Sequence, residues 1–274
     1  MTTLDPSAVP DYAGLMRLDG KGVVVLGAGQ GIGRQVTHAL AQAGAKTLCV
    51  DFNARCAEEI AAEVGGIACA ADVTARDAME RVFVDARKNL NQPYAVVDVV
   101  GRAHVGPMET TDDEIYWRQH EIVFRHAWLA IQQGAPWLAE AGGGSIVLVG
   151  SLSGARTSPN QALYGSLKAA VHHLAESATL EYAQRGVRVN TVAPGPTRTP
   201  RLVQLLGAQW PDMEAAIPTR RAANPSDVAG AVLFLCTPLA RQITGQTLLV
   251  DGGMSCTVMR HTPRSPFKTT AIDS

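Results

Sequence analysis

The chain of 274 residues has few cysteines, and their arrangement excludes two kinds of stabilisation. The five cysteines, Cys49, Cys56, Cys69, Cys236 and Cys256, are odd in number, and no two have the C-x-x-C spacing. A disulfide framework and a zinc site are therefore not expected, and we predict no metal ion. The same cysteines fit a reducing compartment, so we expect a cytoplasmic protein.

An excess of charge and long apolar runs are also missing. The formal net charge of −1 gives no basic surface for nucleic acid or for an anionic membrane. No apolar run reaches the roughly 18 residues that a membrane-spanning helix needs. The first residues are acidic and interrupted by prolines, and they lack the apolar segment of a signal peptide. We therefore expect neither a nucleic-acid partner nor a membrane partner.

Apolar residues, at 46%, are abundant enough for a full core. Short apolar runs alternate with segments of helical period, and most of the runs are continuous, which is typical of strands buried on both faces of a parallel sheet. Strands are expected at 22–27, 46–51, 67–71, 94–100, 144–150, 187–193 and 246–250. Helices are expected at 31–44, 55–64, 75–90, 113–140, 161–185 and 225–237. The pattern predicts an α/β fold with one doubly wound, seven-stranded parallel sheet flanked by helices.

Both ends of the chain differ in composition from this alternating region. Residues 1–18 are expected to form an N-terminal arm, and residues 19–256 a single domain. The segment 257–274 carries prolines and few apolar residues, so we expect a C-terminal tail.

A glycine-rich loop follows the first expected strand. Residues 27–33 read GAGQGIG, and glycine is favoured where the backbone turns at positive φ or approaches another group closely. The N–H groups at the start of the next helix attract a phosphate. Asp51 ends the second strand, where its carboxylate can bind both ribose hydroxyls and repel a 2′-phosphate. The loop predicts a dinucleotide site that prefers NAD to NADP.

Tyr164 and Lys168 stand four residues apart in an expected helix and therefore share one helical face. A free tyrosine has a pKa of about 10, and a neighbouring ammonium group lowers that pKa toward the range of a usable acid or base. Ser151 closes a strand at the carboxyl edge of the sheet, where open α/β sheets bind ligands. The three residues are candidates for catalysis.

Together these motifs resemble the classical short-chain dehydrogenase/reductase family over residues 18–254. The glycine loop, the element Asp72-Val73-Thr74, the trio Ser151, Tyr164 and Lys168, and a Pro-Gly loop at 194–199 occur in the family's order. The resemblance implies a single-domain Rossmann fold with a substrate lid at about 199–221. The cofactor-binding residues that it implies are Gly27, Gln30, Gly31, Ile32, Gly33, Asp51, Asp72, Val73, Gly101, Tyr164, Lys168, Pro194, Gly195, Thr197 and Thr199.

The resemblance also implies a reaction. Tyr164 would exchange a proton with a secondary alcohol or ketone while hydride passes between the substrate carbon and NAD. Lys168 would lower the pKa of Tyr164 and reach the nicotinamide ribose, and Ser151 would bind the substrate oxygen. The function expected is that of an NAD-dependent oxidoreductase, and the alternative is a weakly active NAD-binding pseudoenzyme acting as a sensor or scaffold.

The sequence departs from the family at two points. The family's Asn-Asn-Ala-Gly is replaced by Asp98-Val99-Val100-Gly101, so Asp98 either replaces an asparagine or is buried and needs a partner. The family's catalytic asparagine is replaced by Val123 or Phe124, which cannot anchor a water in a proton relay. No catalytic role is assigned to the nearby His120 and His126, which fit a helix surface or an interface.

The remaining features concern the substrate and the assembly. The expected lid carries many apolar side chains, which favour a hydrophobic alcohol or ketone. Arg201, Arg220 and Arg221 leave room for an anionic handle such as a CoA thioester. Arg102 and His104 follow Gly101 and fit ordinary loop polarity, with contact to a substrate carboxylate or carbonyl as the alternative. The long helices at 113–140 and 161–185 match the family's interface helices, so a homotetramer is expected, with a dimer as the alternative.

Overall fold

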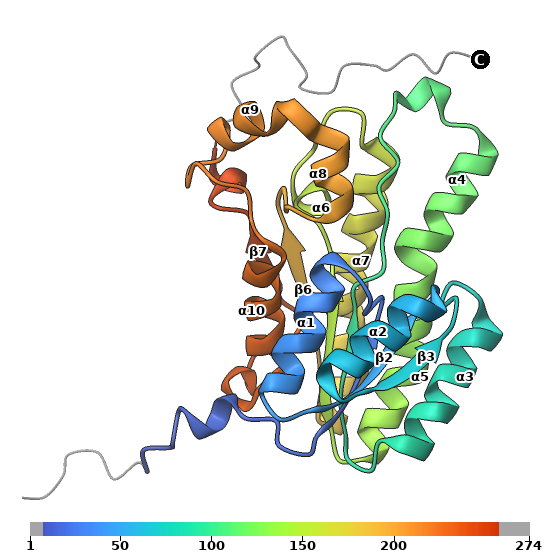
Figure 1. The fold of residues 1–274 in the computed structure, drawn as a ribbon, viewed down its shortest axis with the longest axis vertical. Coiled ribbons are helices and arrows are strands. Elements are labelled where there is room, and N and C mark those ends of the chain that lie inside the picture. Colours follow the sequence, from blue (N-terminus) through green and yellow to red (C-terminus); the bar gives the residue numbers. More distant parts are fainter. Residues whose placement is uncertain (1–7, 258–274) are drawn as a thin grey trace, which may run out of the picture.

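A computed structural model describes residues 8–257 of the chain, so the expected tail, apart from Thr257, lies outside the described residues. The fold is built on one seven-stranded sheet in the order β3-β2-β1-β4-β5-β6-β7, and every strand pair is parallel. Figure 1 shows the sheet standing between two layers of helices. The strands are β1 (Gly22–Leu26), β2 (Lys46–Asp51), β3 (Ile67–Ala70), β4 (Pro93–Asp98), β5 (Gly144–Val149), β6 (Val187–Pro194) and β7 (Thr247–Val250). The predicted fold class is confirmed.

Helices cover both faces of the sheet, as continuous apolar strands require. The helices α1 and α10 pack together on one face with α2 beside them, while α3, α5 and α7 cover the other face. The main helices are α1 (Gly31–Gln42), α2 (Ala54–Val64), α3 (Arg76–Asn89), α4 (Asp113–His120), α5 (His126–Glu140), α7 (Ala162–Tyr182) and α10 (Pro225–Cys236). Their bounds agree with the expected helices to within a few residues, except in the segment 113–140.

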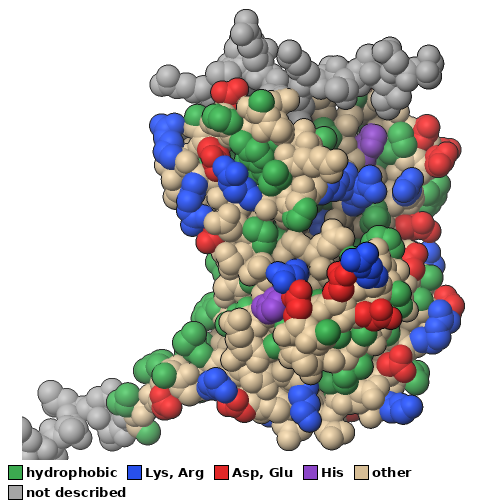
Figure 2. All heavy atoms as spheres, in the orientation of Figure 1, with side chains coloured by type: hydrophobic (Ala, Val, Ile, Leu, Met, Phe, Trp, Pro, Cys, Tyr) green, Lys and Arg blue, Asp and Glu red, His purple; other side chains and the backbone are tan. Residues whose placement is uncertain are grey.

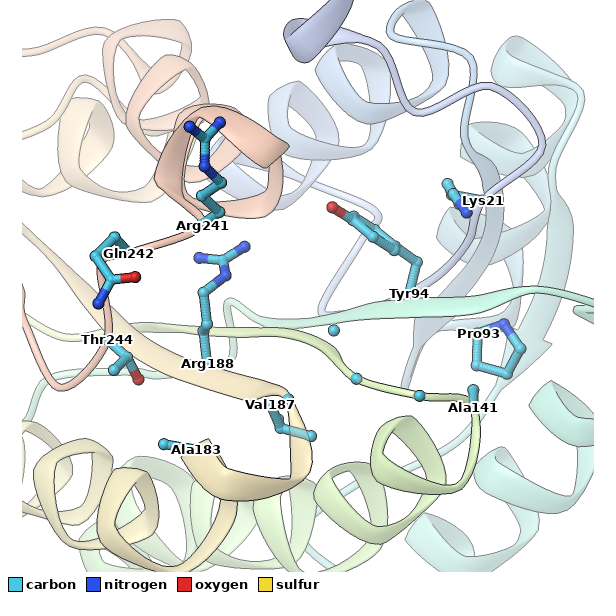
Figure 3. A pocket seen from close by; sticks show the side chains of 14 residues that line it. Lys21, Pro93, Tyr94, Ala141, Ala183, Val187, Arg188, Arg241, Gln242 and Thr244 are labelled. Atoms are coloured by element: carbon cyan, nitrogen blue, oxygen red, sulfur yellow. The ribbon is translucent and has the colours of Figure 1, made fainter. Parts of the chain in front are cut away.

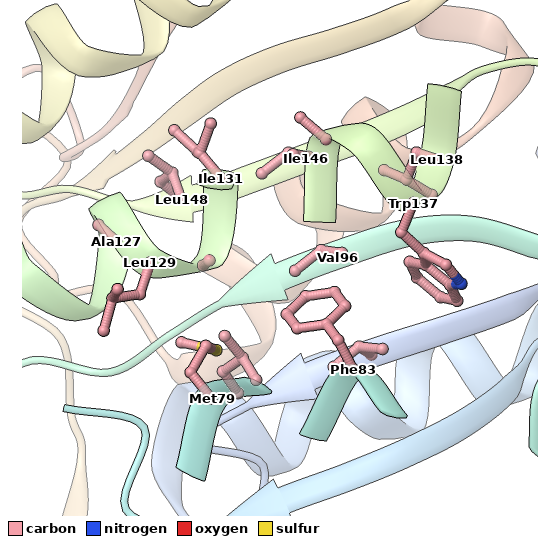
Figure 4. Packing of buried hydrophobic residues seen from close by; sticks show 14 of the residues in the cluster. Met79, Phe83, Val96, Ala127, Leu129, Ile131, Trp137, Leu138, Ile146 and Leu148 are labelled. Carbon is pink, nitrogen blue, oxygen red and sulfur yellow. The ribbon is translucent and has the colours of Figure 1, made fainter. Parts of the chain in front are cut away.

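Two apolar cores lie on opposite faces of the sheet. Under α3, α5 and α7, Phe83 meets Trp137 edge to face with ring centroids 5.7 Å apart, and both pack toward Val96 and Ile146 of the central strands (Figure 4). The second core lies under α1, α2 and α10 and includes Leu18, which is 1% exposed. The C-terminal end of the expected arm is therefore anchored in the domain.

The expected helix 113–140 is divided in the structure. α4 ends at His120, a π-helical turn spans Glu121–Arg125, and α5 begins at His126. A π turn inserts one extra residue per turn and often marks a functional site. The turn packs on α7, which carries Tyr164 and Lys168.

The expected lid contains two short helices, α8 (Pro200–Leu206) and α9 (Trp210–Ala215). The buried side chains Leu206, Trp210, Met213 and Ile217 form a small core of their own with Ala222. These apolar residues therefore hold the lid together instead of lining a substrate cavity.

A cavity of about 520 Å³ opens at the amino edge of the sheet, between the starts of β4, β5 and β6. Tyr94 and Arg188 face one another across it, as Figure 3 shows. Because the candidate catalytic side chains lie at the opposite, carboxyl edge, this cavity is separate from them. Within residues 8–257, no helix combines the length and apolar character needed to cross a bilayer.

Candidate active site

Ser151, Tyr164 and Lys168 meet at the carboxyl edge of the sheet. Ser151 follows β5 and caps the short helix α6 (Leu152–Ala155), where its hydroxyl accepts a hydrogen bond from the Ser153 backbone N–H at 3.1 Å. Tyr164 and Lys168 lie one turn apart on α7, which packs against α6. The Lys168 Nζ atom is 6.0 Å from the centroid of the Tyr164 ring.

The surroundings of the Tyr164 phenol pull its pKa in two directions. Burial raises the pKa, while a hydrogen bond with Ser151 and the positive charge of Arg201 lower it, and burial outweighs both. The sequence assigns the lowering effect to Lys168, and in this structure Arg201 is a further cation whose charge lowers the pKa of the phenol. Tyr164 is thus linked to Ser151 and to a lid arginine.

Lys168 is a fully enclosed ammonium group. Its Nζ donates a hydrogen bond to the Val149 carbonyl at 2.7 Å, and a Cβ on Gly101 would lie 3.1 Å from it. Burial lowers the pKa of Lys168 to about 8, and the negative charge of Asp98 opposes that shift. Gly101 is therefore the residue that makes room for the lysine, in addition to its expected place beside the cofactor.

His172 lies one turn beyond Lys168 on α7 and was not identified from the sequence. Its Nε2 accepts a hydrogen bond from the Ser151 backbone N–H at 3.4 Å, and it lies where a Cβ on Gly150 or Gly154 would be. Burial lowers the pKa of His172 to about 4, and the Lys168 charge acts in the same direction. The ring is therefore neutral at pH 7 and positions Ser151. The sequence does contain a signal for it, because His172 follows Lys168 by four residues and therefore lies on the same face of α7.

Asp98 is buried and has a buried partner. Its Oδ2 lies 2.6 Å from Nδ1 of His126, whose Nε2 lies 3.1 Å from the Ile122 carbonyl, and its Oδ1 accepts from the Val100 N–H at 3.1 Å. Both side chains are at most 2% exposed. His126 is thus a buried partner of Asp98 rather than a surface or interface residue, and the sequence expectation for it was wrong.

His120 and the positions of the missing asparagine lie in or beside the π turn. Val123 is fully buried, and Phe124 packs against the same core. The His120 ring contacts the rings of Trp117 and Phe124, with centroids 5.9 Å and 5.5 Å away. Within residues 8–257, none of these side chains forms a hydrogen bond with Lys168, whose Nζ donates to the Val149 carbonyl.

The glycine loop has the shape of a dinucleotide cradle. Gly27 and Gly31 have φ values of +82° and +54°, and a Cβ on Gly33 would lie 1.8 Å from the Gly27 carbonyl oxygen. Gln30 is the N-cap residue of α1, and its side chain leaves the first N–H groups of the helix uncapped. Asp51 Oδ2 accepts from the Gly29 N–H at 2.9 Å. Free N–H groups beside a carboxylate fit a pyrophosphate followed by a ribose.

The other expected cofactor residues lie around the same edge. The Asp72 carboxylate accepts from the Thr74 N–H and hydroxyl, and Val73 is 5% exposed. Across the edge, the Gly195 N–H donates to Val250, and the Thr199 hydroxyl caps α8. Three further expected residues lie at the same edge. Ile32 is in the first turn of α1, Pro194 ends β6, and Thr197 forms an isolated β-bridge with Ala223. A Cβ on Gly31 would meet Thr199 at 3.4 Å, so the two loops face each other.

A second cavity, of about 330 Å³, opens between the loop after β4, α4 and α8, and Arg201, whose charge acts on the Tyr164 phenol, is one of its lining residues. Arg102, Arg118 and Arg201 line it. Gln119, which is 6% exposed, holds the loop by accepting from the His104 N–H at 2.9 Å and donating to the Arg102 carbonyl at 3.1 Å. The apolar residues that line the same cavity are Ala103, Val105, Ile115, Ile122 and Leu205.

Of the three arginines expected to bind an anion, only Arg201 lines this cavity. The Arg220 guanidinium donates to the Ala215 carbonyl. Arg221 pairs with Asp227 at 2.6 Å. The guanidinium groups of Arg220 and Arg221 therefore form contacts within the expected lid and its flank. The arginines that line the cavity together with Arg201 are Arg102 and Arg118.

Comparisons with known proteins agree with this geometry. The family model described as enoyl-(acyl carrier protein) reductase matches residues 27–255. Galactitol 2-dehydrogenase (L-tagatose-forming) of Cereibacter sphaeroides is 36% identical over 89% of this chain and 98% of its own length. The 7alpha-hydroxysteroid dehydrogenase of Escherichia coli K12 is 33% identical over 87% of this chain and 95% of its own.

A solved structure has the same fold with ligands bound. It is a 7alpha-hydroxysteroid dehydrogenase complexed with NADH and 7-oxo glycochenodeoxycholic acid, with a TM-score of 0.85 and 31% identity over 88% of this chain and 97% of that one. The family match, these relatives and the shared fold lead to one conclusion: the chain belongs to the short-chain dehydrogenase/reductase family and is an oxidoreductase that acts on CH–OH groups with a nicotinamide cofactor.

Proposed function

We propose that the protein is an NAD-dependent oxidoreductase that interconverts a hydrophobic secondary alcohol and its ketone, with Tyr164 as acid and base. The observation that carries the proposal is the grouping of Ser151, Tyr164 and Lys168 at one edge of the sheet, beside the glycine loop. When bound, the nicotinamide supplies the hydride acceptor or donor.

The chain's own residues handle the proton. In the oxidation direction, Tyr164 takes the hydroxyl proton of the alcohol, and in reduction it returns one to the carbonyl oxygen. The Ser151 hydroxyl, which helps to lower the pKa of the phenol, binds the same substrate oxygen and stabilises the charge that develops on it. The Lys168 ammonium group has three N–H donors, and one of them donates to the Val149 carbonyl. The other two are available to the Tyr164 phenol and to the nicotinamide ribose.

The preference for NAD rests on Asp51. Its carboxylate is held by the N–H groups of Gly29 and Asn53, so its charge is fixed at the end of β2. A ribose diol can donate hydrogen bonds to that carboxylate, whereas a 2′-phosphate is repelled. Gly27, Gly31 and Gly33 give the pyrophosphate room beside it.

We assign the hydrophobic part of the substrate to the cavity that Arg201 lines. Val105, Ile115, Ile122 and Leu205 supply its apolar wall. The alternative is an NAD-binding scaffold, which the replacement of the catalytic asparagine by Val123 or Phe124 favours. The buried pairing of Asp98 with His126 and the grouping of Ser151, Tyr164 and Lys168 support the enzyme.

We also propose a cytoplasmic homotetramer. The five cysteines are free thiols, which fits a reducing compartment. Large apolar side chains are exposed on the two faces where copies would meet, Trp128 and Leu180 on α5 and α7, and Phe234 and Leu248 on α10 and β7. Light scattering after size-exclusion chromatography would measure the mass of the assembly.

The Tyr164→Phe variant tests the proposed reaction. It should abolish NADH formation from hydrophobic secondary alcohols at mildly alkaline pH, and calorimetric binding of NAD should remain near the wild-type affinity. Tyr182→Phe, at the far end of α7, is the matched control and should retain turnover. Undiminished turnover by Tyr164→Phe would overturn the proposal.

A further inference from the structure

The cavity between the loop after β4, α4 and α8 has an unusual distribution of charge. Arg102 comes from the loop after β4, Arg118 from α4 and Arg201 from α8, so three separate elements bring arginines to one cavity. No aspartate or glutamate lines the cavity, and within residues 8–257 none of the three arginines forms a salt bridge. Figure 2 shows basic side chains gathered on the surface between α8 and α4.

Two of the groups that line the cavity lack a compensating partner in the described part of the chain. The Arg102 charge, together with burial, lowers the pKa of Arg201, so the two guanidinium groups repel each other. The Nε2 atom of His104, another lining residue, is buried and has no hydrogen-bond partner in the described part of the chain. An anion placed between these groups would relieve the repulsion and accept several charge-assisted hydrogen bonds.

We infer that this cavity binds an anionic group of the substrate, a carboxylate, sulfonate or phosphate attached to a short apolar skeleton, with Arg102, Arg118 and Arg201 as its ligands. The inference rests on the proposed function, because it names the substrate class of the same site. Arginine is suited to this role because its planar fork matches an oxyanion in two hydrogen bonds. A volume of about 330 Å³ fits a small molecule with its charged handle.

The position of Arg201 links the handle to the chemistry. It lies close enough to Tyr164 for its charge to act on the phenol, and its Nη2 lies 3.5 Å from the Ala103 carbonyl. Tyr164 and Ser151 do not line the cavity, so Arg201 is the residue through which a bound anion is connected to the phenol. The apolar wall of Ile115 and Ile122 receives the skeleton between the two ends.

The test compares ketones that differ only in charge. The probes are 4-acetylbenzoate, 4-acetylbenzenesulfonate and 4-acetylphenyl phosphate, with 4-acetylbenzamide as the neutral counterpart. NADH oxidation gives kcat/KM for each probe, and saturation-transfer NMR on the NADH-loaded protein measures binding without turnover. We expect kcat/KM for at least one anionic probe to exceed that for the amide by tenfold or more. The probe with the highest value identifies whether the cavity prefers a carboxylate, a sulfonate or a phosphate.

Arg118→Gln separates recognition from chemistry, because Arg118 lies on α4 away from the phenol. The preference for the anion should fall about fivefold or more in this variant. Arg221→Gln, which removes a guanidinium paired with Asp227 outside the cavity, is the matched control and should keep the wild-type preference. Equal binding of amide and anions, or a preference that survives Arg118→Gln, would overturn the inference. Loss of NADH binding or of all ketone reduction would contradict the proposed function instead.

Discussion

The Asp98 Oδ2 atom lies 2.6 Å from His126 Nδ1, and the other nitrogen of the same ring faces the Ile122 carbonyl at 3.1 Å. Both ring nitrogens of His126 therefore face an oxygen, one of the Asp98 carboxylate and one of the Ile122 carbonyl. The pair joins the end of β4 to the first turn of α5, directly after the π turn. It holds the central strand in place where the family uses an asparagine amide.

Removing one partner of this pair should be more harmful than removing both. His126→Leu leaves the Asp98 carboxylate buried without its partner and should lower the free energy of unfolding by about 3–5 kcal/mol. The double variant Asp98→Asn/His126→Leu should recover part of that loss, since no charge is left unpaired. Urea unfolding measures both values. His120→Leu is the control, with a smaller effect expected, and a double variant no more stable than His126→Leu would contradict the argument.

The pH dependence of turnover should report the Lys168–Tyr164 pair. Because burial holds the pKa of Lys168 at about 8 while it raises that of Tyr164, the pair loses its first proton near pH 8. Alcohol oxidation needs the deprotonated pair, so kcat/KM should rise with pH through a midpoint near 8 and level at higher pH, and ketone reduction should fall over the same range.

Asp98→Asn should move that profile. The Asp98 charge raises the pKa of Lys168, so its removal should shift the midpoint below 8. Profiles of kcat/KM for wild type and variant between pH 6 and 10 measure the shift. A midpoint that stays in place would separate Asp98 from the proton chemistry and leave it a purely structural role.

His172 should make stability depend on pH. Its folded pKa of about 4 lies below its ordinary value near 6.5, so the folded protein binds this proton less readily than the unfolded chain. The stability involved is complete above about pH 6.5 and is lost as the pH falls toward 4. Between pH 7 and pH 5, the wild type should lose about 2 kcal/mol more than His172→Gln. Its exposed neighbour serves as control, because His173→Gln should track the wild type.

The sequence predicts the order of elements well because buried parallel strands are continuous apolar runs, such as Val23–Leu26, that differ clearly from amphipathic helices. It predicts Ser151, Tyr164 and Lys168 because their spacing on a strand end and one helix face is local. The pairing of Asp98 with His126, 28 residues apart, depends on how α5 packs on β4, and no local pattern encodes it. The gathering of Arg102, Arg118 and Arg201 depends likewise on three elements distant in the chain.

Two glycine-to-alanine changes should have opposite effects. In Gly33→Ala, the new Cβ would lie 1.8 Å from the Gly27 carbonyl oxygen, so the glycine loop must shift, with loss of stability and of NAD binding. Gly230 is exposed in α10, and a Cβ added there would have no neighbour within 4 Å, so Gly230→Ala should stabilise the protein by up to about 1 kcal/mol. Thermal unfolding and NAD titration measure both. If Gly33→Ala bound NAD as tightly as the wild type, the close approach of residue 33 to the Gly27 carbonyl would not be needed for NAD binding.

Asp51 should set the choice of cofactor through its charge as well as its hydrogen bonds. Asp51→Asn keeps an oxygen that can accept from the Gly29 N–H, at 2.9 Å in the wild type, but removes the charge that repels a 2′-phosphate. The ratio of kcat/KM for NAD to that for NADP should therefore fall about tenfold or more, with the gain on the NADP side. Asp51→Ala also removes the acceptor, so it should lose activity with NAD in addition. Asp77→Ala, which removes an exposed carboxylate paired with Arg81, is the control. A wild-type enzyme that used both cofactors equally would show that a fixed carboxylate at this position does not exclude the phosphate.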